Sequence, residues 1–348
     1  MKRKSRKGLY FLTVAAVLAA IAYIGYTLGY KYYSVKILKI ATDETAYIYI
    51  TPQDNAASTM AKIKTAVPTA NTDGFATLAA HNNYDSRKRS GKYAIKDGDT
   101  MRDIYNRIVS RQQTPVRITI PSTRSVRQAI GVISNQLMAD SADIVAYTSP
   151  VAMSCFGVDK ANIPAFFLPD TYEVYWDITA EDLFVKMSAW NRQFWNEERK
   201  AKAKAAGLTP AQVSTLASIV DEETTNTAEM PTVAGLYINR LKRGMPLQAD
   251  PTVKYALGDP TRRRILNKDL EVNSPYNTYK HTGLPPGPIR IPTKQAIESV
   301  LNYQKHNYLY MCAKEDFSGT HNFAKTLAEH NANARKYQQA LNKLKIKK

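Results

Sequence analysis

Residues 208–224 read LTPAQVSTLASIVDEET, the pattern of a capped helix that carries an acid on its apolar face. Thr209 can cap this helix, Pro210 suits its first turn, and Gln212 completes a capping box. Apolar residues then recur at helical spacing, and at 100° per residue Glu223 falls beside them. We therefore expect Glu223 to be desolvated, which raises the pKa of a carboxyl group toward the range of a general acid.

The two acids that precede Glu223 are predicted to lie in other environments. Asp221 projects off the apolar face, and Glu222 points almost opposite to it, with Thr215 and Ser218. The pattern therefore predicts that only Glu223 loses its water. On periodicity alone the alternative stays open that this acid is solvated or pairs with an arginine.

The N-terminal segment predicts a membrane anchor. Residues 1–8 form a basic stub, and residues 9–30 are an uncharged stretch long enough to cross a bilayer. The basic flank predicts a single-pass protein of the inner (cytoplasmic) membrane, with its N-terminus in the cytoplasm and its main body periplasmic or extracytoplasmic. A cleaved signal peptide, cut after residues 20–22, is the alternative, and both interpretations export the main body.

Composition limits the class of protein and its partners. The chain has 348 residues, of which 44% are hydrophobic, so it can build folded cores. Its net charge of +18 would attract anionic lipid and acidic wall polymer outside the cell. Nucleic acid is not expected as a partner of an exported chain. No metal-ligand spacing surrounds Cys155 or Cys312, so we expect no metal site and no cofactor. Whether these two cysteines pair stays open.

Three strand–turn–helix units follow one another in the domain predicted for residues 36–145, and we expect them to pack together. The middle unit, YAIKDGDTMRDIYNRI, resembles a LysM-type carbohydrate-binding module, in which a strand is followed by a Gly-Asp-Thr turn and a helix. A purely structural layer of strands and helices is the alternative. The expected strands are 46–50, 92–95 and 116–120, and the expected helices are 56–65, 101–109 and 126–137.

Residues 150–348 are predicted to form a second domain, so that the exported part as a whole is α+β. Residues 283–292, GLPPGPIRIP, should form a rigid extended loop, because proline fixes its own dihedral angle and restricts its neighbour. Helices are expected, besides the one described above, at 183–204, 232–243 and 327–344.

Five motifs occur in this second domain: FFLPDTY, ASIVDEET, VAGLYINRLKRGMPLQADPTVKYAL, YNTYKHTGLPPGPI and THNF. Together and in this order they resemble the YceG/MltG family of membrane-anchored endolytic murein transglycosylases. The family reads Glu, a basic residue, Glu and Thr where this chain has residues 221–224, so the resemblance implies that Glu223 is the catalytic residue. The chain departs from the family at Asp221 and Glu222. Two neighbouring negative charges would push the pKa of Glu223 further up.

The residue types around these motifs suit a glycan-binding cleft. Aromatic faces stack on sugar rings, and amide and carboxyl groups bind hydroxyl and N-acetyl groups. Each of these side chains could instead have only a packing or capping role. The expected substrate-binding residues are Asn239, Gln248, Asp250, Tyr276, Asn277, Tyr279 and His321.

The resemblance implies the reaction and the partners. Glu223 would protonate the oxygen of the β-1,4 bond between MurNAc and GlcNAc, and would then accept the proton of the MurNAc C6 hydroxyl as a 1,6-anhydro ring closes. Such a cut in a nascent peptidoglycan strand would end its elongation, in partnership with penicillin-binding synthases. The alternatives are a muramidase-type hydrolase, with Asp250 as the second carboxylate, and a membrane-tethered scaffold that binds peptidoglycan without cutting it.

Overall fold

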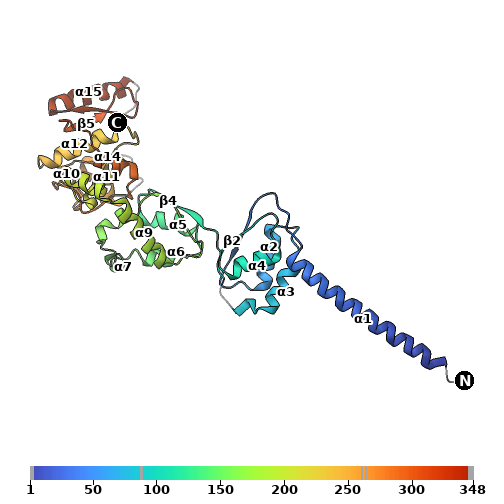
Figure 1. Cartoon of the computed structure of the whole chain (residues 1–348). Coiled ribbons are helices and arrows are strands. Elements are labelled where there is room, and N and C mark those ends of the chain that lie inside the picture. The colour runs from blue at the N-terminus through green and yellow to red at the C-terminus, as the bar shows by residue number, and fades with distance from the viewer. Residues whose placement is uncertain (1–3, 87–88, 260–261, 263–264, 344–348) are drawn as a thin grey trace. The chain divides into compact units, whose positions relative to one another are not determined.

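The computed structural model describes residues 4–86, 89–259, 262 and 265–343, and the chain divides into two compact units. Unit 1 comprises Met1–Arg117 and Glu173–Ile178, and unit 2 comprises Ile118–Tyr172 and Thr179–Lys348. Helices dominate both units, and the described residues contain three two-stranded sheets (Figure 1). The mixed helix-and-strand class predicted from the sequence is confirmed.

Helix α1 (Lys4–Lys36) contains a segment, Gly8–Lys36, that by length and composition could cross a membrane, with a mean hydropathy of 2.0. Its apolar side chains are exposed, as they would be against lipid. The end of α1 packs against α3 (Asp73–His81), where a Cβ at Gly74 would lie 2.3 Å from a backbone oxygen of α1. The predicted apolar helix is therefore present, and the first three residues of the predicted stub lie outside the described part of the chain.

Unit 1 is built on an antiparallel pair of strands, β1 (Ala46–Ile50) and β2 (Gly91–Ile95). Ile48 and Ile50 point into the core, because alternate residues of a strand face the same side. The first two predicted strand–turn–helix units therefore form. The helical segments that complete the unit are α2 (Ala56–Ala66), α3, the short turn η1 (Tyr84–Ser86) and α4 (Met101–Val109).

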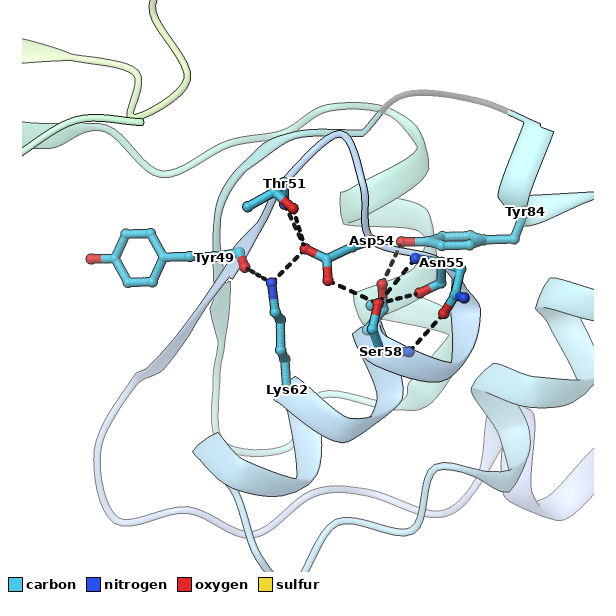
Figure 2. Close-up of polar contacts among 8 residues, drawn as sticks. Tyr49, Thr51, Asp54, Asn55, Ser58, Lys62 and Tyr84 are labelled. Carbon is cyan, nitrogen blue, oxygen red and sulfur yellow. Dashed lines mark hydrogen bonds and ion pairs between the residues drawn. The ribbon is translucent and has the colours of Figure 1, made fainter. Parts of the chain in front are cut away.

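Asp54 organises the turn between β1 and α2 (Figure 2). Its carboxylate accepts hydrogen bonds from the backbone nitrogen of Thr51 (2.7 Å), from the hydroxyl of Ser58 (2.8 Å) and from the ammonium of Lys62. Lys62 also donates to the carbonyl oxygen of Tyr49 at 2.8 Å. Burial alone would raise the pKa of Asp54, but the hydrogen bonds outweigh burial and lower this pKa to about 2.

The third strand–turn–helix unit does not join this sheet. Its strand β3 (Val116–Ile120) pairs with β4 (Asp170–Val174), and its helix α5 (Val126–Ser134) belongs to unit 2. In unit 2, α5 packs against the following helix, α6 (Ser141–Ala146). The expectation that all three units pack together is therefore wrong for the third.

The stretch 183–204, predicted as one helix, forms two. Helix α9 (Ala180–Phe194) stops before Asn196, whose side chain accepts a hydrogen bond of 2.9 Å from the backbone nitrogen of Arg199 and so caps α10 (Glu197–Ala206). Asparagine favours a cap over a helix interior because its side chain competes for backbone hydrogen bonds.

Helix α11 (Pro210–Glu223) begins with the predicted capping box and is buried on all sides over most of its length. Every residue from 213 to 221 is buried, so the side of α11 that carries Thr215 and Ser218, opposite the apolar face, is enclosed as well. The hydroxyl of Ser218 instead donates to the carbonyl oxygen of Thr215 (2.7 Å) and accepts from the backbone nitrogen of Ile289 (3.0 Å). The helices that contact α11 are α8 (Ile163–Phe166), α10, α12 (Met230–Lys242), α13 (Asp250–Leu257) and α14 (Lys294–Leu301).

The C-terminal part of unit 2 adds a hairpin and a helix. Strands β5 (Tyr310–Ala313) and β6 (His321–Ala324) pair antiparallel, and α15 (Leu327–Lys343) packs against both. The predicted helices at 232–243 and 327–344 are confirmed as α12 and α15, although residue 344 lies outside the described part. Both cysteines are free thiols. The remaining short helices are α7 (Pro150–Ser154), η2 (Lys160–Asn162) and η3 (Asn267–Glu271).

The Asp54→Asn substitution should lower the free energy of unfolding of unit 1 by about 1–2 kcal/mol at neutral pH, because it removes the charge that Lys62 pairs with. The folded-state pKa of Asp54 lies below its value in an unfolded chain, so this stabilisation is present above about pH 4 and is lost as the pH falls toward 2. Urea titrations of the full chain in detergent, followed by the fluorescence of Trp176 with the other two tryptophans replaced by Phe, measure the difference. The exposed Asp43→Asn serves as the control, and an equal loss at every pH would contradict the assignment.

Candidate active site

A cavity of about 390 Å³ lies in unit 2 where α11 ends. Several residues singled out in the sequence border it, although they come from segments up to about a hundred positions apart. The cavity is therefore a product of the fold and not of one motif. Its lining residues are Glu223, Leu236, Tyr237, Arg240, Leu247, Gln248, Asp250, Tyr279, Tyr310, Met311, Cys312, Ala313, His321, Leu327 and His330.

Glu223, the last residue of α11, presents a half-buried carboxyl group to this cavity. Its Oε1 accepts a hydrogen bond of 2.6 Å from the hydroxyl of Tyr237. Burial raises the pKa of Glu223 above its ordinary value, and the charge of Asp250 adds to this rise, whereas the bond from Tyr237 lowers it. The net direction is upward, so the group holds its proton to a higher pH than a solvated glutamate.

Tyr237, on α12, is the polar partner that the sequence interpretation missed. Only 2% of its surface is exposed, and burial together with the nearby Glu223 raises its pKa well above the ordinary value. The hydroxyl therefore stays protonated and remains a hydrogen-bond donor to the carboxyl group. Helical spacing places Tyr237 with the apolar residues Val233 and Leu236 and so indicates only a packing role. A buried tyrosine hydroxyl needs a partner, and this requirement was the signal available in the sequence.

The other two acids of the motif have partners of their own. The buried Asp221 accepts hydrogen bonds from the backbone nitrogen and the hydroxyl of Thr293, both at 2.7 Å, and burial raises its pKa as well. Glu222 pairs with Arg290 at 2.8 Å and with Arg124 at 3.2 Å. The prediction that only Glu223 is desolvated is therefore wrong. Among nearby carboxylates, the main cause of the raised pKa of Glu223 is Asp250, on another helix, and not its two neighbours in the sequence.

Asp250 and Tyr279 form a second polar pair in the cavity. Asp250 is the first residue of α13, and its Oδ1 accepts a hydrogen bond of 2.6 Å from the hydroxyl of Tyr279. Burial, followed by this bond, raises the pKa of Tyr279 above its ordinary value. The cavity thus contains two carboxyl groups, each held by a tyrosine hydroxyl.

His321 is held in place by an acid that the sequence interpretation did not consider. The Nδ1 of His321 lies 2.9 Å from Oε2 of Glu229, and the backbone nitrogen of His321 donates to Oε1 of Glu229 at 2.7 Å. The same Oε2 accepts a hydrogen bond of 3.1 Å from the hydroxyl of Thr224, the residue after Glu223. Glu229 therefore joins strand β6 to the end of α11 and fixes the imidazole at the cavity.

Arg240 holds the loop that carries Gln248. Its guanidinium, on a residue only 7% exposed, donates to the carbonyl oxygens of Leu309 (2.6 Å) and Leu247 (2.9 Å) and to the side chain of Gln248 (3.2 Å). Gln248 has a φ of 51°, a left-handed conformation that the Arg240 bonds help to maintain. Its side chain is exposed and borders the cavity.

Three of the predicted substrate-binding residues do not border this cavity. The amide of Asn239 donates to the carbonyl oxygens of residues 306 and 308, at 2.7 and 3.1 Å. Asn277 is completely buried, and its amide donates to the carbonyl oxygens of residues 270 and 272, at 2.7 and 2.9 Å. Tyr276 packs on Tyr255 with the ring centres 4.7 Å apart. Their contact with substrate stays a prediction.

The arrangement can supply acid–base chemistry from a single side chain. Glu223 is positioned to give up a proton, and Tyr237 can stabilise the carboxylate that results. Within the described ranges, no three His, Cys, Asp or Glu side chains lie close enough together to hold a metal ion.

Comparisons with known proteins agree on one family. The profile of the YceG-like family matches residues 48–336. A Bacillus subtilis protein named endolytic murein transglycosylase is 39% identical over 183 residues, which are 53% of this chain and 50% of that protein. A Streptococcus pneumoniae protein of the same name is 28% identical over 87% of this chain and 60% of its own length. The chain thus spans about half to three fifths of these relatives.

A solved structure extends the similarity to the fold. The crystal structure of a yceG-like protein from Listeria monocytogenes is 26% identical to this chain and superposes with a TM-score of 0.54. The match covers 84% of this chain and 99% of that one.

Glu223→Gln should stabilise the full chain by about 1 kcal/mol near pH 8. Because the folded-state pKa of Glu223 is raised, the unfolded chain ionises first, and the wild type loses stability as the pH rises. Glutamine keeps the shape and can still accept the bond from Tyr237. Below about pH 4 the acid is protonated in both states, and the difference should vanish.

Thermal unfolding in detergent between these pH values measures the effect. Glu222→Gln is the matched control, and it should destabilise near pH 8 because it loses pairing with Arg124 and Arg290. A Glu223→Gln chain that is less stable than the wild type near pH 8 would show that the carboxyl group is not held in a desolvating site.

Proposed function

The chain belongs to the YceG-like family, and from this premise we propose that it is an endolytic lytic transglycosylase, a lyase that cuts peptidoglycan. The bond cut is the β-1,4 link between MurNAc and GlcNAc in a nascent strand, and the cut ends elongation of that strand. The observation that carries the proposal is the raised pKa of Glu223 at the cavity, in a chain whose relatives are named endolytic murein transglycosylases.

The protonated Glu223 donates its proton to the glycosidic oxygen, and the bond from that oxygen to the anomeric carbon of MurNAc breaks. The Glu223 carboxylate, stabilised by the hydroxyl of Tyr237, then accepts the proton of the MurNAc C6 hydroxyl. The C6 oxygen bonds to the anomeric carbon and closes the 1,6-anhydro ring. No water is consumed, and Glu223 ends the cycle protonated, as it began.

Two polar contacts support substrate positioning in this scheme. The hydroxyl of Tyr279 is directed to Asp250, and the imidazole of His321 is held by Glu229, so both cavity-lining groups are fixed before substrate binds. Fixed polar groups lose little freedom on binding, which favours a defined orientation of the sugar rings. We propose that these residues and Gln248 contact the glycan.

The second candidate reaction is hydrolysis of the same bond. The position of Asp250 supports hydrolysis, because this residue brings a second carboxylate to the cavity that Glu223 lines. Glycosidases that use water employ two carboxylates, one of which activates the water or attacks the sugar.

The anchor and partners follow from the same premise. We propose that α1 anchors the chain in the cytoplasmic membrane with its basic N-terminus inside and units 1 and 2 outside, which protease treatment of intact cells tests. Cell-wall synthases of the penicillin-binding class are the proposed partners, since a cut in a nascent strand must occur near its synthesis.

Purified full chain in detergent should produce murein fragments with 1,6-anhydro-MurNAc ends, detected by mass spectrometry. Glu223→Gln should slow their release by about a hundredfold or more, the usual contribution of a general acid–base group. Fragments with ordinary reducing ends would show that the chain is a hydrolase and not a lyase. In that case Asp250→Asn should abolish activity. Unchanged glycan in the presence of wild-type protein would leave only a binding role.

Unit 1 is proposed to be a LysM-like module that binds glycan. Support comes from the Gly-Asp-Thr turn between β2 and α4, and from Tyr47 and Tyr49, which are exposed on the same side of β1. Replacing both tyrosines by Ala should weaken co-sedimentation of the full chain with murein by about threefold to tenfold. Both the chain with Tyr47 and Tyr49 and the chain without them carry Glu223→Gln, which prevents cutting during the measurement. Undiminished binding by the second chain would contradict a glycan-binding role for unit 1.

A further inference from the structure

A second cavity, of about 530 Å³, lies in unit 2 and shares two borders with the first. Glu222 lines it, whereas the next residue, Glu223, lines the first cavity. In the same way Pro251 lines the second cavity and Asp250 the first. The end of α11 and the start of α13 therefore lie between the two cavities and form a partition.

The charges around the second cavity are mostly positive. The single carboxylate of Glu222 is shared by two guanidinium groups, those of Arg290 and Arg124, which leaves an excess of positive charge. Lys254, one turn along α13 from Asp250, adds another cation to the lining. A cavity with this excess of positively charged side chains attracts an anion.

Lys254 is the cation available to a ligand. Its side chain is half-buried and makes no ion pair with a described residue, and the sequence places no Asp or Glu among the residues outside the described ranges. Lys254 lies on α13, whose first residues form part of the partition. A half-buried lysine without an ion-pair partner among the described residues gains from an anionic ligand.

Apart from the charged residues, the lining consists of the polar Ser125 and Gln128 and of a mainly apolar wall. Pro251, Tyr255 and Ile289 contribute carbon-rich surface, and the ring of Tyr255 is braced by Tyr276 at 4.7 Å. A bare sugar carries no negative charge and would leave the Lys254 ammonium without a counter-ion. A short peptide with free carboxylates offers both apolar side chains and negative charge.

We propose that the second cavity binds the anionic peptide stem of the murein strand whose sugar chain occupies the first cavity. The inference rests on the proposed function, because the stem is attached to the MurNAc ring at which Glu223 acts. Lys254 receives a carboxylate of the stem, and the wall formed by Pro251 and Tyr255 receives its apolar side chains. The partition between the cavities then separates sugar recognition from peptide recognition.

Lys254→Gln tests this assignment in the full chain with Glu223→Gln, so that the ligands stay intact. The ligands are a murein tetrasaccharide with its peptide stems, the same tetrasaccharide without peptide, and the stem-bearing form with amidated carboxyl groups. Lys254→Gln should raise the Kd of the first by about tenfold, the loss expected for one charge-assisted hydrogen bond, and leave the other two unchanged. Calorimetry measures all three.

Lys202→Gln is the matched control, because it removes one positive charge from α10, where Lys202 pairs with Glu198 outside both cavities. Equal weakening of the stem-bearing and bare sugars by Lys254→Gln, or no weakening of either, would overturn the assignment. Cleavage of murein by the wild-type chain is measured separately. Without cleavage the proposed function fails, whereas cleavage together with an ineffective Lys254→Gln refutes only the peptide site.

Discussion

The burial of residues 213–221 of α11 is the constraint on which the architecture of unit 2 depends. The polar side chains in this stretch have no solvent, so each must find a partner inside the protein. Ser218 binds the backbone of Ile289, and Asp221 binds Thr293, which caps α14. These bonds fix the proline-rich loop and the start of the helix that follows it. Glu223 is then the residue at which the enclosed helix reaches the cavity.

Three consecutive acids at the end of such a helix would repel one another unless their charges were handled separately. The structure does so with different partners: backbone and hydroxyl donors for Asp221, two guanidinium groups for Glu222, and a tyrosine hydroxyl for Glu223. As a result, burial is the main influence on the pKa of Glu223, and the nearby negative charge comes from Asp250, a residue of another helix. Residues 221 and 222 differ from the family pattern. Because each has its own partners, this difference leaves burial as the main influence on the pKa of Glu223.

Local signals in the sequence predicted much of the fold and one central part of the site. Capping residues, turn residues and helical spacing located α11, α12, α15 and the strands of unit 1, because these features depend on neighbours in the chain. They could not show that α11 is enclosed on its polar face, since two of the helices that pack against it, α8 and α14, lie far away in sequence. For the same reason the sequence did not reveal that Glu229 holds His321, or that the amides of Asn239 and Asn277 bond to the backbone. Contact of these two asparagines with substrate stays a prediction. The break at Asn196 is a local signal that the apolar spacing on either side concealed.

The pair formed by Glu223 and Tyr237 meets both demands of the proposed reaction. A group that acts first as an acid and then as a base must hold a proton at rest and yet remain tolerable as a carboxylate. Burial supplies the first property by raising the pKa of Glu223, and the hydrogen bond from Tyr237 supplies the second by opposing that rise. The tyrosine cannot compete for the proton, because its own pKa is raised well above the ordinary value. The bond can therefore persist in both protonation states, so that stabilisation of the carboxylate requires no rearrangement of the protein at the moment the proton leaves.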